Sequence, residues 1–283
     1  MKEFLQSISP SFPSKSEAFN TYYFAHGVAS AEFGDCLLVT LDTCRAHGLG
    51  YSADVTKEIF EVGTLTSSMI EKTIDFATNS SCSHVVIAMH HHPMKVRGDD
   101  DDHEAHIANG EAFLNALQST GKNVLVLHGH KHLVEVKHAN DDVNSPVVFS
   151  SSSLCAYPYT PNQTDFSNQF HIVEFDTSVT SNPCGTIYSW DRGAQSWIKS
   201  KRPHMPFEVP FGISPDLKQV ASEIIALENV TFSDRETLIN NIPGLKYVKI
   251  NQIDQLNIML KDTGKKLIQN SGAITGMIYE EVR

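Results

Sequence analysis

Short apolar runs alternate with amphipathic stretches over the first 178 or so residues of the chain. Continuous apolar runs bounded by polar residues are typical of strands in the interior of a layered sheet, covered on both faces. The predicted strands are 34–43, 84–89, 123–128, 145–153 and 170–176, and the predicted helices are 67–80 and 103–120. Ser68 and Glu71 have capping-box spacing at the start of the first helix. The pattern predicts an α/β domain over residues 1–178.

The pattern changes after this domain. Residues 185–200 are typical of a hairpin with its turn at 191–193. Residues 201–215 contain four of the 12 prolines and are predicted to be an extended linker. Helices are predicted from Ser214–Pro215 onward, over 233–242 and over 252–269. Residues 179–283 are therefore predicted to form a hairpin, a linker and a small, mostly helical module.

Charge and cysteine content narrow the class of protein. The net charge of −11 argues against a general nucleic-acid-binding surface, although metal ions could still hold a phosphate locally. No apolar run approaches the roughly 18 residues that a membrane helix needs, and the N-terminus lacks the apolar segment of a signal peptide. The five cysteines form no Cys-x-x-Cys pair. Unpatterned cysteines predict reduced thiols and a cytoplasmic location.

Histidines are concentrated in one part of the chain, since ten of the 14 lie between residues 84 and 138. Histidine is the commonest metal ligand and the usual acid or base near neutral pH. One group, His90-His91-His92-Pro93, follows the predicted strand 84–89, and Gly129-His130-Lys131-His132 follows the predicted strand 123–128. Ligands bind beyond the carboxyl ends of strands in α/β sheets. The two groups are therefore predicted to meet and form a metal site.

Individual residues in these groups have different expected roles. Gly129 is expected to let the backbone turn sharply and approach a ligand closely. The spacing of His130 and His132 directs their imidazoles to neighbouring points in an extended or turning segment. His84, His106 and His138 are expected to be ordinary, partly exposed loop residues. His128 either supports the site from behind or simply ends its strand.

Five segments of the chain resemble a known family. In chain order they are LVTLDT, VVIAMHHHPMK, VLVLHGHKH, VVFSSSS and FHIVEFD. They are similar to the C-terminal half of the calcineurin-like metallophosphoesterases, particularly the cyclic-nucleotide phosphodiesterase branch. The resemblance covers about residues 20–178. It implies a layered β-sandwich flanked by helices, and a hydrolase that acts on a phosphate ester such as a phosphodiester or cyclic nucleotide.

The resemblance also implies a set of site residues. His90 and His130 would bind one metal ion, and His132 would bind a second. The family uses pairs drawn from Mn, Fe, Zn, Co and Ni, which imidazole suits. Two such ions can activate a water and stabilise the oxygens of a phosphoryl transfer. His91 is the expected catalytic residue, facing the substrate or supporting the ligands, and His92 is expected to be structural.

The sequence departs from the family on its N-terminal side. The family motifs Asp-x-His, Gly-Asp-x-x-Asp and Gly-Asn-His-Asp/Glu have no counterpart, so the fold is expected to be N-terminally incomplete. The acidic segment 98–106 contains Asp101 and Asp102, which are possible accessory carboxylates. Acidic residues also favour helix N-termini, so a solvated loop that begins a helix is the alternative.

Three explanations of this departure remain open. The missing half-site comes from another chain or from upstream sequence; the chain is a non-catalytic assembly or binding subunit; or a single metal acts with the acidic loop. Half a sheet leaves an unpaired edge and an apolar face. A partner subunit or homo-oligomer is therefore expected to complete the sheet and site. The amphipathic stretch 252–269 either makes that contact or packs on its own domain.

Overall fold

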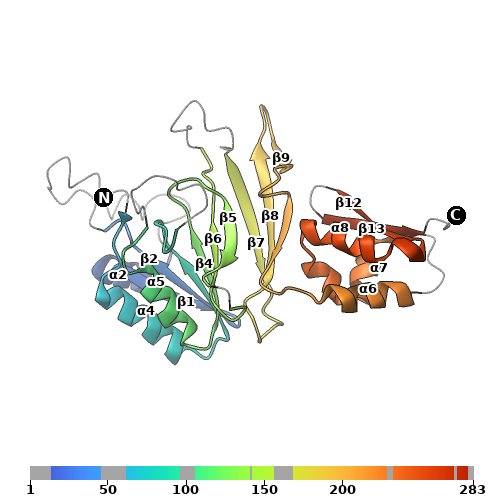
Figure 1. Cartoon of the computed structure of the whole chain (residues 1–283). Helices are drawn as coiled ribbons and strands as arrows, with labels where there is room; N and C mark the ends of the chain where they lie inside the picture. The colour runs from blue at the N-terminus through green and yellow to red at the C-terminus, as the bar shows by residue number, and fades with distance from the viewer. Residues whose placement is uncertain are drawn as a thin grey trace. The chain divides into compact units, whose positions relative to one another are not determined.

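A computed structural model describes residues 14–45, 62–95, 106–140, 142–155, 168–227, 232–270 and 273–279. The fold is mixed α/β, and the chain divides into two compact units (Figure 1). The first unit comprises Met1–Phe166 and Thr177–Pro183, and the second comprises Ser167–Asp176 and Cys184–Arg283. The predicted boundary at residue 178 lies within Thr177–Pro183 of the first unit, whereas Ser167–Asp176, which precedes it, belongs to the second.

The first unit is built on a six-stranded sheet with strand order β1-β2-β3-β4-β6-β5. Its strands are β1 (Val28–Phe33), β2 (Cys36–Leu41), β3 (His84–Ala88), β4 (Asn123–His128), β5 (Glu135–His138) and β6 (Val147–Ser150). Its helices are α2 (Glu17–His26), α4 (Ser67–Asn79) and α5 (Gly110–Gln118). The strands β2, β3, β4 and β6 run parallel, while β1 and β5 pair antiparallel at the two edges. The four apolar runs predicted as strands before residue 167 all form strands.

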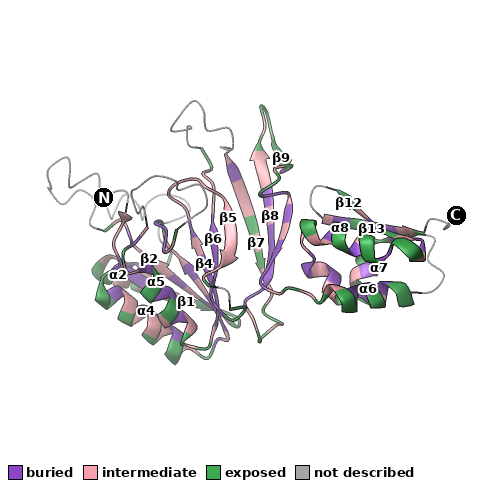
Figure 2. Cartoon of the chain, viewed as in Figure 1, coloured by how far each residue is buried: buried purple, intermediate pink, exposed green. Residues whose placement is uncertain are grey.

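The core of this unit lies between the sheet and its helices. Leu37 and Val39 of β2 pack in one buried cluster with Met69 of α4 and Phe113 of α5. Figure 2 shows this buried layer along the strands. Burial on both faces is confirmed for β6, which is buried at every position, but β2 alternates between buried and half-buried residues. Strand β2, which pairs with the edge strand β1, therefore has only one fully covered face.

The first predicted helix starts where expected, since residues 67–80 form α4 (Ser67–Asn79), but its cap differs, and the second helix begins later than predicted. Thr66, in an extended conformation, accepts the N-cap hydrogen bond from the amide of Met69 at 3.2 Å, so the predicted capping box at Ser68 is wrong. Ser68 already lies inside the helix and cannot cap it. Helix α5 begins at Gly110 because the preceding backbone pairs with the first histidine group: the amide of Ile107 donates to the carbonyl of His92 at 2.9 Å.

The second unit contains a four-stranded antiparallel sheet. Its strands are β7 (Gln169–Phe175), β8 (Gly185–Arg192), β9 (Trp197–Lys199) and β10 (Glu208–Phe211). The order is β10-β8-β7, with β9 paired to β8. Strand β10 lies within residues 201–215, so the prediction of a linker over this whole range is wrong. The predicted hairpin is present, with strands that pair from Trp190 with Lys199 to Arg192 with Trp197. Its turn lies further along than the predicted 191–193, because Asp191 and Arg192 still belong to β8. Because β7 pairs with β8 along its whole length, it belongs to this unit, although the sequence assigns it to the domain 1–178.

The C-terminal part of this unit is less helical than predicted. It contains α6 (Leu217–Ala226), β11 (Phe232–Asp234), α7 (Arg235–Asn241), α8 (Ile250–Met259), β12 (Lys265–Asn270), β13 (Ala273–Tyr279) and the 3-10 turns η1 (Pro243–Tyr247) and η2 (Lys261–Thr263). The predicted helix 252–269 stops early, since Gly264 adopts a left-handed φ of 72° and the chain continues as β12 beside β13. The N-cap of α6 is Asp216, two residues beyond Ser214.

The amphipathic face of α8 packs within its own module. Ile253 and Leu256 have no exposed surface and share a cluster with Leu267 of β12 and Met277 of β13. Of the two alternatives for the stretch 252–269, packing on its own domain is therefore the one observed for α8. Within the described segments, no helix has both the length and the apolar character to cross a membrane.

We predict that Gly110→Ala destabilises the protein by about 1–3 kcal/mol, as overpacking does. A Cβ at Gly110 would lie 2.0 Å from the carbonyl oxygen of Pro93, which is backbone and cannot rotate away. Urea unfolding measures the change. Gly129→Ala is the control, because its Cβ would meet only the Ser151 hydroxyl at 3.6 Å. Equal stability of the two variants would contradict the packing of α5 on the histidine loop.

Candidate metal centre

The two histidine groups meet at the carboxyl end of the parallel strands. The amide of Gly129 donates to the carbonyl of His90 at 3.0 Å, which ties together the loops after β3 and β4. Nδ1 of His130 lies 3.2 Å from Nε2 of His90, although the residues are 40 positions apart. Two nitrogens bound to one tetrahedral ion at 2.0–2.1 Å lie about 3.3 Å apart. The observed distance therefore suits a direct hydrogen bond or a shared ion.

The His91 ring lies beside both rings of this pair and has no exposed surface. Its Nδ1 is 2.9 Å from the hydroxyl of Thr43, and its backbone amide donates to the same hydroxyl at 3.2 Å. A Cβ added to Gly63 would lie 2.3 Å from the His91 ring, so only glycine leaves room for it. The His91 ring centroid is 4.6 Å from that of His130. The predicted catalytic residue is thus held rigidly behind the more exposed His90.

His92 and His128 form a second, buried pair with ring centroids 4.7 Å apart. They are 1% and 3% exposed, respectively. Within the described part of the chain, neither ring nitrogen of His92 has a hydrogen-bond partner, and Nε2 of His128 also lacks one. Burial lowers the pKa of His92 to about 2 and that of His128 to about 4. Both rings are therefore neutral near pH 7, which is the form that binds metals.

The loop that carries His130 and His132 has an unusual backbone. His130 has a φ of 82° and His132 a φ of 60°. Left-handed conformations are uncommon outside glycine and cluster at functional sites. The expected sharp turn at Gly129 is wrong in detail, because the left-handed residues of this loop are the histidines. His132 is half-buried, and desolvation lowers its pKa.

Cys44 is a metal-capable residue that the histidine pattern does not reveal. Among the described residues, the group of three potential ligands whose atoms all lie within 4.8 Å of one another is Cys44, His90 and His91. His132, predicted to bind a second ion, is outside this group. Burial and the nearby carboxylate of Asp42 raise the pKa of the Cys44 thiol to about 11. Its position just beyond an apolar strand is the same signal that identifies the histidine groups.

The remaining candidates separate into structural and undescribed residues. His84 is fully buried, with Nδ1 3.2 Å from Asp35 and Nε2 3.0 Å from the carbonyl of Val179, so it is a core histidine and not the predicted loop residue. His138 lies in β5, where Nδ1 is 3.4 Å from the carbonyl of Ser145. The proposed accessory carboxylates, Asp101 and Asp102, lie outside the described residues.

Comparison with known proteins adds no assignment. No protein-family model matches the chain, and no curated protein matches it closely enough to be a relative. The geometry of the site therefore carries the functional argument.

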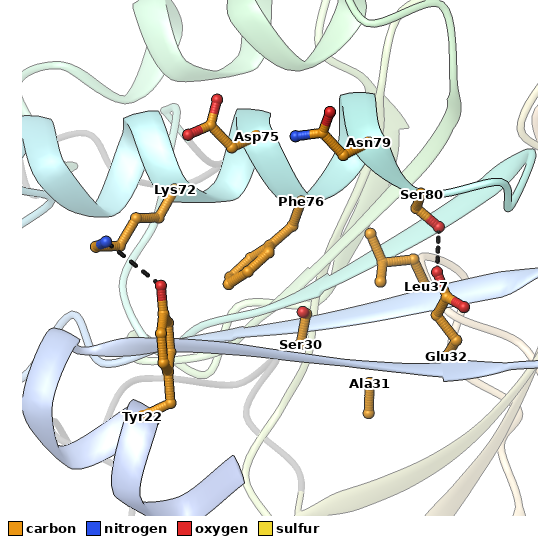
Figure 3. A pocket seen from close by; sticks show the side chains of 10 residues that line it. All are labelled: Tyr22, Ser30, Ala31, Glu32, Leu37, Lys72, Asp75, Phe76, Asn79 and Ser80. Carbon is orange, nitrogen blue, oxygen red and sulfur yellow. Dashed lines mark hydrogen bonds between the residues drawn. The ribbon is translucent and has the colours of Figure 1, made fainter. Parts of the chain in front are cut away.

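A pocket of about 550 Å³ lies between α4 and the edge strand β1. Figure 3 shows Phe76 pointing from α4 toward the strands, and hydrogen bonds from Lys72 to Tyr22 at 3.3 Å and from Ser80 to Glu32 at 2.6 Å. Leu37, near the start of β2, also lines it. The pocket therefore extends toward the amino ends of the parallel strands, whereas the histidine groups follow their carboxyl ends.

We predict that Gly63→Ala weakens metal binding and lowers the free energy of unfolding more than Gly34→Ala does. Both glycines have left-handed φ values, 75° and 60°, so both substitutions carry the same backbone cost of about 1–2 kcal/mol. Only Gly63 contacts the His91 ring, whereas nothing lies within 4 Å of a Cβ at Gly34. Isothermal titration and urea unfolding compare the variants. Identical affinities would show that the position of His91 does not affect the site.

We predict that the metal-free protein, kept in a chelator, loses stability as the pH falls below about 6.5. The unfolded chain protonates its histidines near that pH, whereas folded His92 and His128 stay neutral to about 2 and about 4. The unfolded state then binds more protons, so each histidine lowers the free energy of unfolding by up to about 1.4 kcal/mol per pH unit. Urea unfolding from pH 7 to 4.5 measures the slope.

His92→Leu should make this pH dependence shallower, because it removes one group whose pKa differs between the two states. His204→Leu, at an exposed histidine, is the control for removing an imidazole that is not buried. An unchanged slope in His92→Leu would show that His92 is not held neutral by burial.

Proposed function

We propose that the chain is a metal-dependent phosphoesterase related to the calcineurin-like family, with a phosphodiester or cyclic nucleotide as the first expected substrate class. The observation that carries this proposal is the 3.2 Å approach of His90 and His130 from the ends of two parallel strands. A hydrogen bond between two imidazoles at a solvent-exposed strand end contributes little to stability. Metal binding gives such an arrangement a chemical reason.

The residues present fit a transition-metal ion. Imidazole suits Mn, Fe, Co, Ni and Zn, and His92 and His128 keep unsatisfied, neutral nitrogens beside the exposed pair. Leaving buried polar atoms without partners costs about 1–3 kcal/mol each, which is unusual outside a functional site. No aspartate or glutamate of the described segments joins a group of three potential ligands. The described part of the site therefore supports one ion, and a second ion bound by His132 needs carboxylates from elsewhere.

The residues of the histidine site have different roles in this proposal. A bound ion would supply Lewis-acid chemistry and a water of lowered pKa. His90 and His130 hold the ion where the substrate can reach it, because His90 is exposed. Lys131, between the two loop histidines, adds positive charge for a phosphate group. His91 has no surface for a substrate, so its burial favours a role on the metal side of the site.

A partner subunit or second copy is part of the proposal. Strand β1 is an edge of the six-stranded sheet, and Phe33 at its end is 65% exposed. Exposed sheet edges pair readily with other chains. Such a chain would be the source of the bridging carboxylates that a two-metal centre requires.

A non-catalytic assembly subunit is the second candidate. It is favoured by the same observation that limits the site, since the described residues near the histidines include no carboxylate ligand group. In that case the fold would serve binding and the histidines would hold a structural ion or none.

We predict that the purified chain binds a transition metal and hydrolyses bis(4-nitrophenyl) phosphate with Mn²⁺ or Zn²⁺ added. His130→Ala should lower metal affinity and kcat/KM by at least about 10- to 100-fold, because it removes one side of the converging pair. His26→Ala, at an exposed histidine at the end of α2, is the control. Metal binding without hydrolysis would support the assembly subunit. Absence of metal binding, even with a co-purifying partner, would refute the enzyme.

A further inference from the structure

Cys44 is a potential ligand that the phosphoesterase motifs do not include. It follows β2, while His90 and His91 follow β3, the parallel neighbour of β2. One ligand atom from each of the three side chains lies within 4.8 Å of the other two. We propose that Cys44, His90 and His91 bind a single divalent ion, with zinc as the preferred metal.

The strand register explains why these residues meet. Thr40 of β2 is aligned with Ala88 of β3. Thr43 and His91 each lie three positions beyond this aligned pair, and the hydroxyl of Thr43 is 2.9 Å from Nδ1 of His91. Cys44 follows Thr43 directly, so it lies at the carboxyl ends of the parallel strands, as the first histidine group does.

Thr43 has the position of a residue that orients a metal ligand. A metal-bound histidine commonly uses one ring nitrogen for the ion and the other for a hydrogen bond that fixes the ring. The Thr43 hydroxyl contacts Nδ1 of His91 and also accepts from the His91 amide at 3.2 Å. The ring and backbone of His91 are therefore both held by Thr43, the residue next to Cys44.

The proposed ligand set has the composition of a zinc site. Zinc accepts sulfur and nitrogen ligands, and its catalytic sites use three protein ligands with a fourth position open to water or substrate. A thiolate is softer than a carboxylate and favours zinc over manganese. It also supplies the negative charge that an all-histidine set lacks. The exposure of His90 keeps one side of such an ion accessible.

His130 has a different part in this arrangement from that in a family-like site. Its Nδ1 contacts Nε2 of His90 at 3.2 Å, so in this ligand set His130 positions His90 and is not itself a ligand. An ion shared by His90 and His130 is the alternative that the test below separates from it. Use of the ion in hydrolysis rests on the function proposed above, but the ligand set does not. The two can therefore be tested separately.

The test is Co²⁺ and Zn²⁺ titration of the full-length, reduced, metal-stripped chain. Wild-type protein should show the thiolate-to-cobalt charge-transfer absorption in the near ultraviolet, which reports sulfur coordination without turnover. Cys44→Ser and Cys44→Ala should lose this absorption and bind Zn²⁺ at least about 100-fold more weakly, more than the loss of an orienting partner causes. Cys36→Ser, at the half-buried first residue of β2, the strand that precedes Cys44, should behave as wild type. His130→Ala should bind Co²⁺ more weakly, but at saturating Co²⁺ it should still show the absorption.

A wild-type cobalt complex without the absorption, or full absorption in Cys44→Ser, overturns the proposal. The wild-type spectrum needs no substitution, so the lack of this absorption overturns the proposal even if a variant fails to fold. Sulfur coordination without phosphodiester hydrolysis supports the ligand set and counts against the enzyme. Mn²⁺-dependent hydrolysis with no sulfur coordination supports the enzyme and counts against the ligand set.

Discussion

The common register of three parallel strands is the constraint on which the site depends. Thr40, Ala88 and Leu127 are aligned across β2, β3 and β4, so the loops that follow these strands all begin at the same carboxyl end of the sheet. Segments distant in sequence must then converge within a few residues of that edge. Val85 and Val126, both fully buried in the core cluster, help to keep the strands in this register.

The fold was predictable wherever a strand is apolar along its length. Strands β3, β4 and β6 are such runs, whereas β5 is half-buried throughout and has no strong pattern. Helix boundaries were less predictable, because Thr66 and Ser68 are both chemically suited to capping and only backbone conformation decides between them. The end of α8 depends on the pairing of β12 with β13, a long-range contact that local helical spacing does not reveal.

The site was predictable to the extent that it follows strand ends. The convergence of His90 and His130 followed from their positions after two apolar runs, and a nitrogen of one ring lies 3.2 Å from a nitrogen of the other. The unsatisfied nitrogens of His92 and His128 depend on burial by other segments, so the sequence alone marked His92 only as structural. Cys44 escaped notice because a lone cysteine has no spacing pattern, although its proximity to His90 is a consequence of strand order.

The left-handed backbone of His130 and His132 destabilises the folded protein but holds two imidazoles in fixed directions for a ligand. A non-glycine residue in that region costs roughly 1–2 kcal/mol, and the loop holds two of them with φ values of 82° and 60°. This cost is part of the free energy of folding and not of binding. A ligand that needs both imidazoles in these directions therefore finds them preorganised. Glycine at either position would relax the backbone and remove the imidazole together, so selection for greater stability alone would erode the chemistry of this loop.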